Sequence, residues 1–150
     1  MTTFVLVHGA WHGGWCWRRV ADLLTARGHN VFTPTLTGLG ARSHLLNDRI
    51  DLDTHVADIV NFIKWECLAD VVLCGHSYGG MVISGVAERS LPAISSIVYL
   101  DAFVPEDGQA IVDLAAPAAR EGVMAVLRQG GKTAPPRTAA HSVMSAGRSA

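Results

Sequence analysis

The chain has 150 residues, of which 49% are apolar and 17% are charged. This composition supplies enough apolar side chains for one folded domain and too few charges for a disordered chain. The formal net charge is −1 and no basic stripe is present, which argues against nucleic acid or an anionic membrane as the main partner. We therefore expect a folded domain that does not act on nucleic acid.

Three cysteines, Cys16, Cys67 and Cys74, are an odd number and lack C-x-x-C spacing, so we expect free thiols. The N-terminus leads directly into the apolar run 3–7, without a basic leader and a cleavage site. No apolar run approaches the roughly 18 residues that a membrane span requires. We therefore expect a cytoplasmic protein that does not bind a membrane.

Four short apolar runs bounded by turn residues have the pattern of strands that are buried on both faces of a parallel sheet. They cover residues 3–7, 30–33, 71–74 and 97–100. Stretches with helical spacing lie between them. Strand and helix patterns that alternate in this way predict an α/β fold.

The first helical pattern covers residues 17–27, with apolar side chains at Trp17, Val20, Ala21 and Leu24. Gly28 follows it where a left-handed C-terminal cap is expected. The second pattern runs from Leu52 to Ile63, with Asp51 available as the N-cap. A third helix is expected to begin near Ser77 and to present small residues to the sheet, which allows a close approach.

Residues 129–150 have a different composition: 15 of these 22 residues are Gly, Ala, Pro, Ser or Thr, and none is acidic. Such a segment cannot supply a core strand. We expect one domain over residues 1–128, followed by a low-complexity, mobile tail over residues 129–150.

The apolar run 71–74 continues into Gly75-His76-Ser77-Tyr78-Gly79, a G-x-S-x-G pattern between a strand and a helix. This order predicts a tight, strained turn with the serine at its apex, because Gly75 and Gly79 omit side chains that would collide across the turn. Ser77 would then be exposed at a helix N-terminus, where developing negative charge is stabilised. Ser77 is therefore the candidate nucleophile, with a chance glycine-rich turn as the alternative.

A second glycine-rich loop, His8-Gly9-Ala10-Trp11-His12-Gly13-Gly14-Trp15, follows the first strand. A loop beside the nucleophile strand can direct a backbone N–H at the acyl oxygen, while the residue after the serine donates the other hydrogen bond. The candidate oxyanion donors are the N–H groups of Ala10 and Tyr78. His8, Trp11 and His12 are candidate substrate-binding residues, and a structural hydrogen-bonding role is the simpler alternative for His8.

The motifs together resemble the α/β-hydrolase superfamily, in particular the branch of plant methylesterases, hydroxynitrile lyases and related bacterial esterases. The resemblance covers residues 3–128 and rests on four motifs in order: His8-Gly9-Ala10-Trp11-His12-Gly13-Gly14-Trp15-Cys16-Trp17, Pro34-Thr35-Leu36-Thr37-Gly38-Leu39-Gly40, Gly75-His76-Ser77-Tyr78-Gly79-Gly80 and Tyr99-Leu100-Asp101-Ala102-Phe103-Val104-Pro105.

This resemblance implies the N-terminal portion of the α/β-hydrolase fold, a three-layer α/β sandwich around a parallel sheet in which residues 105–128 begin the cap region. It also implies Ser77 as the nucleophile and Ala10 and Tyr78 as oxyanion donors. The implied substrates are small carboxylic esters, and neither a metal nor an organic cofactor is implied.

The catalytic acid and base have no clear counterparts in the sequence. The triad of this fold runs in the order Ser, Asp or Glu, His, so both partners must follow Ser77. Asp101 is the candidate acid because it stands at the C-terminal end of a strand, and capping of the adjacent loop is the alternative. His141, the only histidine after Ser77, is the candidate base. The late strands that carry these residues in the family are missing, so we expect a C-terminally truncated chain.

The sequence therefore predicts a serine hydrolase that acts on small carboxylic esters through an acyl-enzyme on Ser77, impaired by the missing acid and histidine. The alternatives are a catalytically inactive hydrolase fold that at most binds an apolar small molecule and a lyase of the hydroxynitrile type. The strand that ends at Asp101 is expected to form an open sheet edge, which favours self-association or poor solubility.

Overall fold

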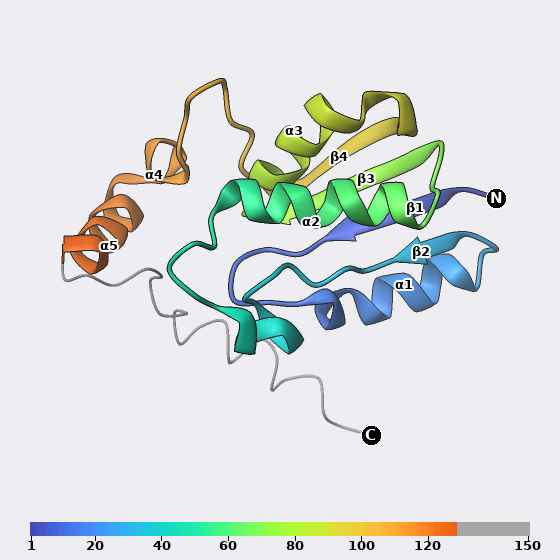
Figure 1. Cartoon of the computed structure of the whole chain (residues 1–150), viewed down its shortest axis with the longest axis horizontal. Helices are drawn as coiled ribbons and strands as arrows, with labels where there is room; N and C mark the ends of the chain where they lie inside the picture. The colour runs from blue at the N-terminus through green and yellow to red at the C-terminus, as the bar shows by residue number, and fades with distance from the viewer. Residues whose placement is uncertain (129–150) are drawn as a thin grey trace. The chain divides into compact units, whose positions relative to one another are not determined.

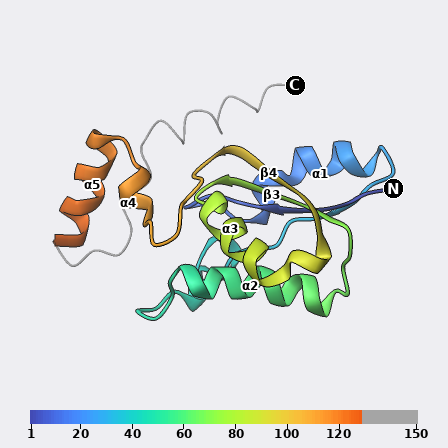
Figure 2. The same cartoon turned by 90° about the horizontal axis from the view of Figure 1, so that it is seen from above.

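A computed structural model of the chain describes residues 1–128, so the predicted tail over 129–150 and its His141 lie outside the described residues. Two compact units are present, Met1–Ile111 and a second unit that begins at Val112. In the first unit, helices cover both faces of a four-stranded parallel sheet (Figure 1 and Figure 2). This arrangement confirms the predicted α/β class and its three layers.

The sheet contains β1 (Thr3–Val7), β2 (Asn30–Phe32), β3 (Val71–Ser77) and β4 (Ile94–Ala102), in the spatial order β2-β1-β3-β4. β1 lies beside β3, with Val7 opposite Gly75, so the loop after β1 leaves the sheet next to the end of β3. β3 and β4 are longer than the predicted runs 71–74 and 97–100. Their ladder continues to the pair Ser77 and Ala102, through glycine and polar residues that the hydrophobic pattern does not include.

The α-helices of the first unit are α1 (Arg18–Thr25), α2 (Leu52–Trp65) and α3 (Gly79–Ser90), accompanied by 3-10 turns at Gly14–Trp17, Gly40–Leu45 and Leu91–Ala93. Asp51 caps α2 as predicted, because its side chain accepts the Thr54 N–H at 2.9 Å. Gly28 has φ +83 after α1, in agreement with its predicted left-handed conformation. α3 begins later than predicted, because Ser77 still belongs to β3 and Tyr78 is the N-cap.

The larger part of the core lies between the sheet and the layer formed by α2 and α3, whereas α1 covers the opposite face (Figure 2). Its buried members are Val5, Val7, Leu36, Val56, Ile59, Ile63, Val71, Leu73, Val82, Ile83 and Val86. The smaller cluster on the α1 face contains Leu6, Trp17 and Cys74. Burial of each large aliphatic side chain stabilises the fold by about 1.5–3 kcal/mol, so this core holds β3 firmly in place.

β4 is the exception to the expected burial on both faces. Ile97, Val98, Tyr99 and Leu100 are 37%, 41%, 37% and 48% exposed. Among the described residues β4 pairs only with β3, which makes it the open edge that the sequence predicts. We refer to residues 97–100 as the β4 edge.

The second unit, described through Arg128, contains α5 (Pro117–Arg128), and α4 (Ile111–Leu114) begins at the boundary between the units. Asp113 and Arg120 form an ion pair at 4.0 Å. Both helices fall within the 105–128 segment that is expected to begin a cap region.

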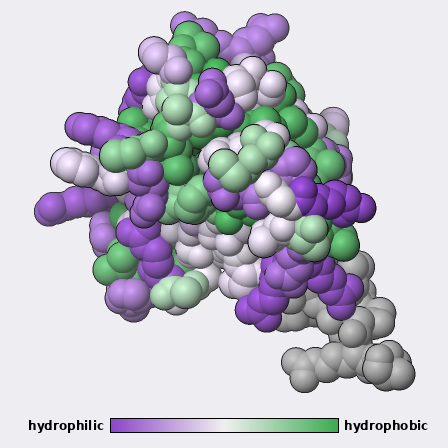
Figure 3. All heavy atoms as spheres, turned by 90° about the vertical axis from the view of Figure 1, so that its right-hand side faces the viewer, coloured by the Kyte–Doolittle hydropathy of each residue, from purple (hydrophilic) through white to green (hydrophobic). Residues whose placement is uncertain are grey.

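The surface shown in Figure 3 has hydrophilic and hydrophobic residues interspersed. None of the helices over residues 1–128 is both long enough and apolar enough to cross a membrane. All three cysteines, Cys16, Cys67 and Cys74, are free, which confirms the predicted free thiols.

Candidate active site

Ser77 occupies a strained turn between β3 and α3. Its φ of +53 lies in the left-handed region, which costs a residue with a Cβ about 1–2 kcal/mol. The next residue, Tyr78, is already in helical geometry with φ −53. The chain therefore passes from strand to helix within one residue, and the half-buried serine stands at the N-terminus of α3.

Three glycines allow this turn to pack closely. A Cβ on Gly75 would lie 2.6 Å from the Gly79 carbonyl oxygen, which is the collision across the turn that the sequence predicts. Gly79 is required for a different reason, because its Cβ would lie 2.6 Å from the carbonyl oxygen of Val7 in β1. A Cβ on Gly80 would lie 2.1 Å from the Phe103 carbonyl oxygen. The turn is thus packed against the ends of both neighbouring strands.

The loop after β1, residues 8–14, passes directly beside Ser77. A Cβ on Gly9 would lie 3.0 Å from the Ser77 Cβ, so only glycine fits there without displacement. His12 Nδ1 lies 2.7 Å from the carbonyl oxygen of Ala10, to which it donates. Trp11 has φ +60 and is 48% exposed. The loop therefore places Ala10 next to the serine, with Trp11 at the surface.

His8 is fully buried, and both of its ring nitrogens bind backbone groups. Nδ1 lies 2.8 Å from the Gly9 carbonyl oxygen, so Nδ1 carries the proton and donates it. Nε2 accepts the Leu36 N–H at 3.1 Å. Burial lowers the pKa of His8 and keeps the ring neutral. No ring nitrogen of this candidate substrate-binding residue is left for a ligand.

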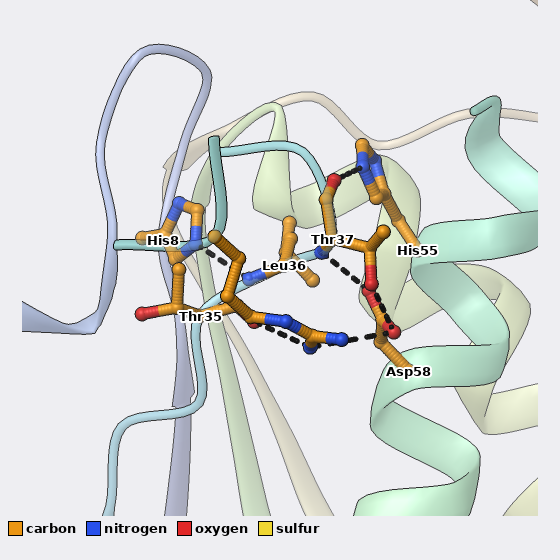
Figure 4. Close-up of polar contacts among 7 residues, drawn as sticks. His8, Thr35, Leu36, Thr37, His55 and Asp58 are labelled. Atoms are coloured by element: carbon orange, nitrogen blue, oxygen red, sulfur yellow. Dashed lines mark hydrogen bonds and ion pairs between the residues drawn. The ribbon is translucent and has the colours of Figure 1, made fainter. Parts of the chain in front are cut away.

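Tyr78 is connected to α2 through a histidine that the sequence analysis does not single out. His55 is 7% exposed, and its Nε2 lies 2.9 Å from the carbonyl oxygen of Thr37 (Figure 4). Nε2 must carry the proton, so Nδ1 accepts the Tyr78 hydroxyl at 2.8 Å. Burial raises the pKa of Tyr78, so the hydroxyl keeps its proton. The available sequence signal was a histidine next to Val56 on the apolar face of α2.

The residues 35–37, which we call the 35–37 segment, are fixed by two further side chains (Figure 4). Asp58 accepts the Thr37 N–H at 2.6 Å and the Thr37 hydroxyl at 2.8 Å. Arg42 donates to the Thr35 carbonyl oxygen at 3.0 Å and lies 3.6 Å from the Asp58 carboxylate. These contacts satisfy backbone groups of a segment that contains the fully buried Leu36.

Asp101 lies on the β4 side of Ser77, in a β-bulge. His76 pairs with Leu100 and Ser77 pairs with Ala102, so Asp101 is the extra residue, with φ +44 and an exposed side chain. Burial lowers the pKa of His76 and the nearby His12 lowers it further, while the Asp101 carboxylate opposes both effects. The structure therefore brings Asp101 into the electrostatic environment of His76.

A cavity of about 230 Å³ opens on the α1 side of this end of the sheet and is lined by His12, Cys16, Trp17, Val20, His76 and Leu100. Burial raises the pKa of the Cys16 thiol to about 11, so the thiol in this cavity wall is uncharged at neutral pH. Within residues 1–128, no group of three or more His, Cys, Asp and Glu side chains is arranged to hold a metal ion.

The arrangement is chemically suited to acyl transfer. A serine hydroxyl stands at a helix N-terminus, where the helix dipole stabilises negative charge. The 8–14 loop, which carries Ala10, passes beside this serine at Gly9, and Tyr78 is the next residue along the chain. Of the predicted site residues, Tyr78 follows Ser77 in the chain and Ala10 follows Gly9, which lies beside Ser77, whereas the proposed base His141 lies outside the described residues.

Comparisons with known proteins place this geometry in a family context. Residues 4–148 match the alpha/beta hydrolase family. A carbendazim hydrolyzing esterase from Nocardioides sp. is 58% identical over 114 residues, which are 76% of this chain and 47% of that protein. Methyl jasmonate esterase 1 from Vitis vinifera is 35% identical over 103 residues, which are 68% of this chain and 40% of the relative.

Solved structures give the same result. An extracellular alpha/beta-hydrolase from a Paenibacillus species, described as sharing structural and functional homology with tobacco salicylic acid binding protein 2, matches with a TM-score of 0.80. Its sequence identity is 34%, and the match covers 87% of this chain and 52% of that chain. The chain thus spans about half the length of the relatives it matches.

Proposed function

We propose that this chain, which belongs to the alpha/beta hydrolase family, is a serine hydrolase that acts on small carboxylic esters through Ser77. The observation that carries the proposal is the left-handed φ of +53 at Ser77, on a turn from strand to helix. Such strain persists only where the surrounding structure maintains it, and it is concentrated at functional sites. The names of the relatives, which are esterases, support the same reaction class.

In the proposed reaction the Ser77 oxygen attacks the ester carbonyl carbon and transfers its proton to a base. The carbonyl oxygen becomes negatively charged and accepts hydrogen bonds from the N–H groups of Ala10 and Tyr78. The intermediate then expels the alcohol, which takes up the proton, and leaves an acyl group on Ser77. Water hydrolyses this ester and releases the carboxylic acid.

We assign Asp101 as the candidate acid and His141 as the candidate base, each as a proposal. The position of Asp101 beside the ladder pair of Ser77 and Ala102 supports its assignment. Without an effective base, a serine hydrolase keeps only the roughly 10³–10⁴-fold rate enhancement that its oxyanion hole and substrate binding supply. We propose that His141 and the exposed Asp101 form at most an ineffective pair, so that turnover by this chain is slow.

Two carboxylic esters, p-nitrophenyl acetate and methyl jasmonate, test the proposal, together with carbendazim, which is the methyl ester of a carbamic acid. Slow hydrolysis of at least one ester that is lost in Ser77→Ala supports the assignment. Equal hydrolysis by the folded Ser77→Ala variant contradicts it. If His141→Ala hydrolyses the ester more slowly than the wild-type chain, the base lies in the segment 129–150. If its rate equals that of the wild type, the base lies elsewhere.

We further propose that the chain self-associates through the β4 edge. The exposed Ile97, Val98, Tyr99 and Leu100 lie on an edge strand, which favours pairing with a second copy of the chain. Size-exclusion chromatography with light scattering tests this proposal. Oligomers that dissociate in a Val98→Lys variant support it, and a stable monomer at all concentrations contradicts it.

The cytoplasmic location expected from the sequence also stays a proposal. The three free cysteines support it, because unpaired thiols are typical of reducing compartments. Cell fractionation followed by detection of the protein tests the location directly.

A further inference from the structure

The two proposed oxyanion donors lie in different parts of the chain, because Ala10 is in the 8–14 loop and Tyr78 is the N-cap of α3. Both parts are connected to the 35–37 segment, and Figure 4 shows two of the contacts, His8 with Leu36 and His55 with Thr37. We infer that the 35–37 segment sets the spacing of the oxyanion hole and that His55 is the positioning residue that links this segment to Tyr78. The inference rests on the proposed function, because a donor spacing has a catalytic meaning only if Ser77 is the nucleophile.

The 8–14 loop, which carries Ala10, is bound to the segment at both of its ends. At the start of the loop, His8 Nε2 accepts the Leu36 N–H at 3.1 Å. At its end, the Gly14 N–H donates to the Thr35 hydroxyl at 2.9 Å. Gly14 allows this approach, because a Cβ there would lie 1.9 Å from the Thr33 carbonyl oxygen. Neighbouring residues of one segment therefore hold both ends of the loop.

Tyr78 is bound to the same segment through its side chain. Its hydroxyl donates to His55 Nδ1 at 2.8 Å, and His55 Nε2 donates to the Thr37 carbonyl oxygen at 2.9 Å. The two rings also meet edge to face, with centroids 5.7 Å apart. The hydroxyl of Tyr78 is therefore held by His55. Since the backbone N–H of Tyr78 is the second proposed donor, this contact helps to fix the residue that carries it.

The segment itself is fixed to α2, the helix that carries His55. Asp58, one helical turn after His55, accepts the N–H and the hydroxyl of Thr37. Thr37 is thus held by two side chains of one helix, one on its N–H and one on its carbonyl oxygen. A change at His55 should consequently reach the 8–14 loop, which carries Ala10 and is bound to the same segment.

The expected effect is on the reaction rate rather than on binding. Removal of a complete oxyanion donor lowers catalytic rates by about 10²–10³-fold. Substitution of His55 leaves both N–H groups in place and displaces them, so we expect a smaller loss, about 10-fold, in the maximal rate of acylation or phosphonylation.

The experiment measures phosphonylation of Ser77 by a fluorophosphonate in the full chain. The serine oxygen bonds phosphorus, its proton passes to solvent, and fluoride leaves. His55→Leu removes both hydrogen bonds, and Tyr78→Phe removes only the phenol hydroxyl. His55→Gln keeps an amide N–H that can reach the Thr37 carbonyl oxygen. Tyr99→Phe is the matched control, because it removes a phenol hydroxyl that contacts the Ser84 hydroxyl at 2.9 Å on the β4 edge.

We expect His55→Leu to lower the maximal labelling rate about 10-fold without a change in the probe's binding constant, and Tyr78→Phe to lower it by less. His55→Gln should recover part of the rate, and Tyr99→Phe should leave it unchanged. An unchanged maximal rate in folded His55→Leu overturns the inference. If His55→Leu does not fold, Tyr78→Phe decides alone: an unchanged rate overturns the inference, and a lower rate supports it.

Backbone amide NMR distinguishes failure of the inference from failure of the proposed function. A folded wild-type chain whose Ser77 is never labelled contradicts the proposed function. In that case the amide signal of Ala10 still tests the connection through the segment. A shift of this signal in Tyr78→Phe or His55→Leu, with none in Tyr99→Phe, supports the spacing role, and an unshifted Ala10 signal overturns it.

Discussion

The chain on the two sides of Ser77 is held in different ways. On the β1 side, the 8–14 loop and the 35–37 segment are bound by the buried side chains of His8 and His55 and by glycines that admit no Cβ. On the β4 side, Asp101 stands in a bulge with an exposed side chain, next to the exposed β4 edge.

This difference separates the two chemical tasks of a serine hydrolase. The side that would stabilise an oxyanion is fixed by contacts within the first unit, residues 1–111. The side that would supply the acid and base depends on one exposed carboxylate and on His141, which lies outside the described residues. Stabilisation of charge and proton transfer can therefore be tested separately in this chain.

The largest expected effect on stability comes from a side chain added inside the tightly packed turn after β3. Gly80→Ala places a Cβ 2.1 Å from the Phe103 carbonyl oxygen, so the backbone must move. We expect a loss of about 3 kcal/mol or more in the free energy of unfolding. Urea denaturation measures it. Gly122→Ala is the control, because its Cβ meets no atom within 4 Å. Equal stability of the two variants would show that the turn is not tightly packed.

The second effect tests the buried histidine. His8→Leu leaves the Leu36 N–H and the Gly9 carbonyl without their partner, which should lower the free energy of unfolding by about 2–3 kcal/mol at pH 8. The pKa of His8 is lowered in the folded state, so the unfolded chain takes up its proton first as the pH falls below 6.5.

The stability that His8 provides is thus present above pH 6.5 and is lost as the pH falls below it. The difference between wild type and His8→Leu should shrink from pH 8 to pH 5. His76, whose pKa is also lowered, is present in both proteins and cancels in this difference. A difference that stays constant with pH would contradict the buried, neutral state of His8.

The third effect compares the same substitution on two strands. Val7 in β1 is 0% exposed, whereas Val98 in β4 is 41% exposed. Val7→Thr buries a hydroxyl and should cost about 1–3 kcal/mol, and Val98→Thr should stay within about 0.5 kcal/mol of wild type. Denaturation curves of both variants test this. The comparison is made at protein concentrations at which the chain is monomeric, and similar losses there would show that Val98 is covered within a single chain.

The smallest effect concerns cysteine reactivity. Cys67 is exposed, whereas burial raises the pKa of Cys16 to about 11 and raises that of Cys74. Since the thiolate is the reactive form, iodoacetamide at pH 8 should alkylate Cys67 first in the folded protein. Peptide mapping identifies the modified residue. Equally fast alkylation of Cys74 would indicate that β3 is accessible.

Sequence reasoning predicted the parts of the fold that depend on local patterns. Periodic apolar residues located α2, and Asp51 marked its first turn correctly. The ends of β3 and β4 were underestimated, because pairing with a neighbouring strand extends a ladder through residues such as Gly75 that lack strand character. Exposure of β4 contradicts the burial inferred from its apolar run, since an apolar run does not reveal whether another element covers it.

The candidate site was also predicted only in part, because local spacing is visible in a sequence and long-range contacts are not. The strained turn at Ser77 follows from the spacing of its glycines, and the structure contains it. His55 was missed, because its partners Thr37 and Tyr78 are 18 and 23 positions away in the sequence. Long-range hydrogen bonds of this kind leave no periodic signal.

Mass spectrometry of the folded chain after exposure to a fluorophosphonate probe tests most directly whether Ser77 is a reactive nucleophile. We expect a single phosphonyl group on Ser77, because the serine stands at the N-terminus of α3 beside the loop that carries the proposed donor Ala10. The proposed lack of an effective base should make its attachment slow and the turnover of p-nitrophenyl acetate small. The Ser77→Ala variant should remain unmodified. Absence of the modification in a sample whose NMR spectrum shows a folded protein, or its attachment to another residue, would contradict the central claim.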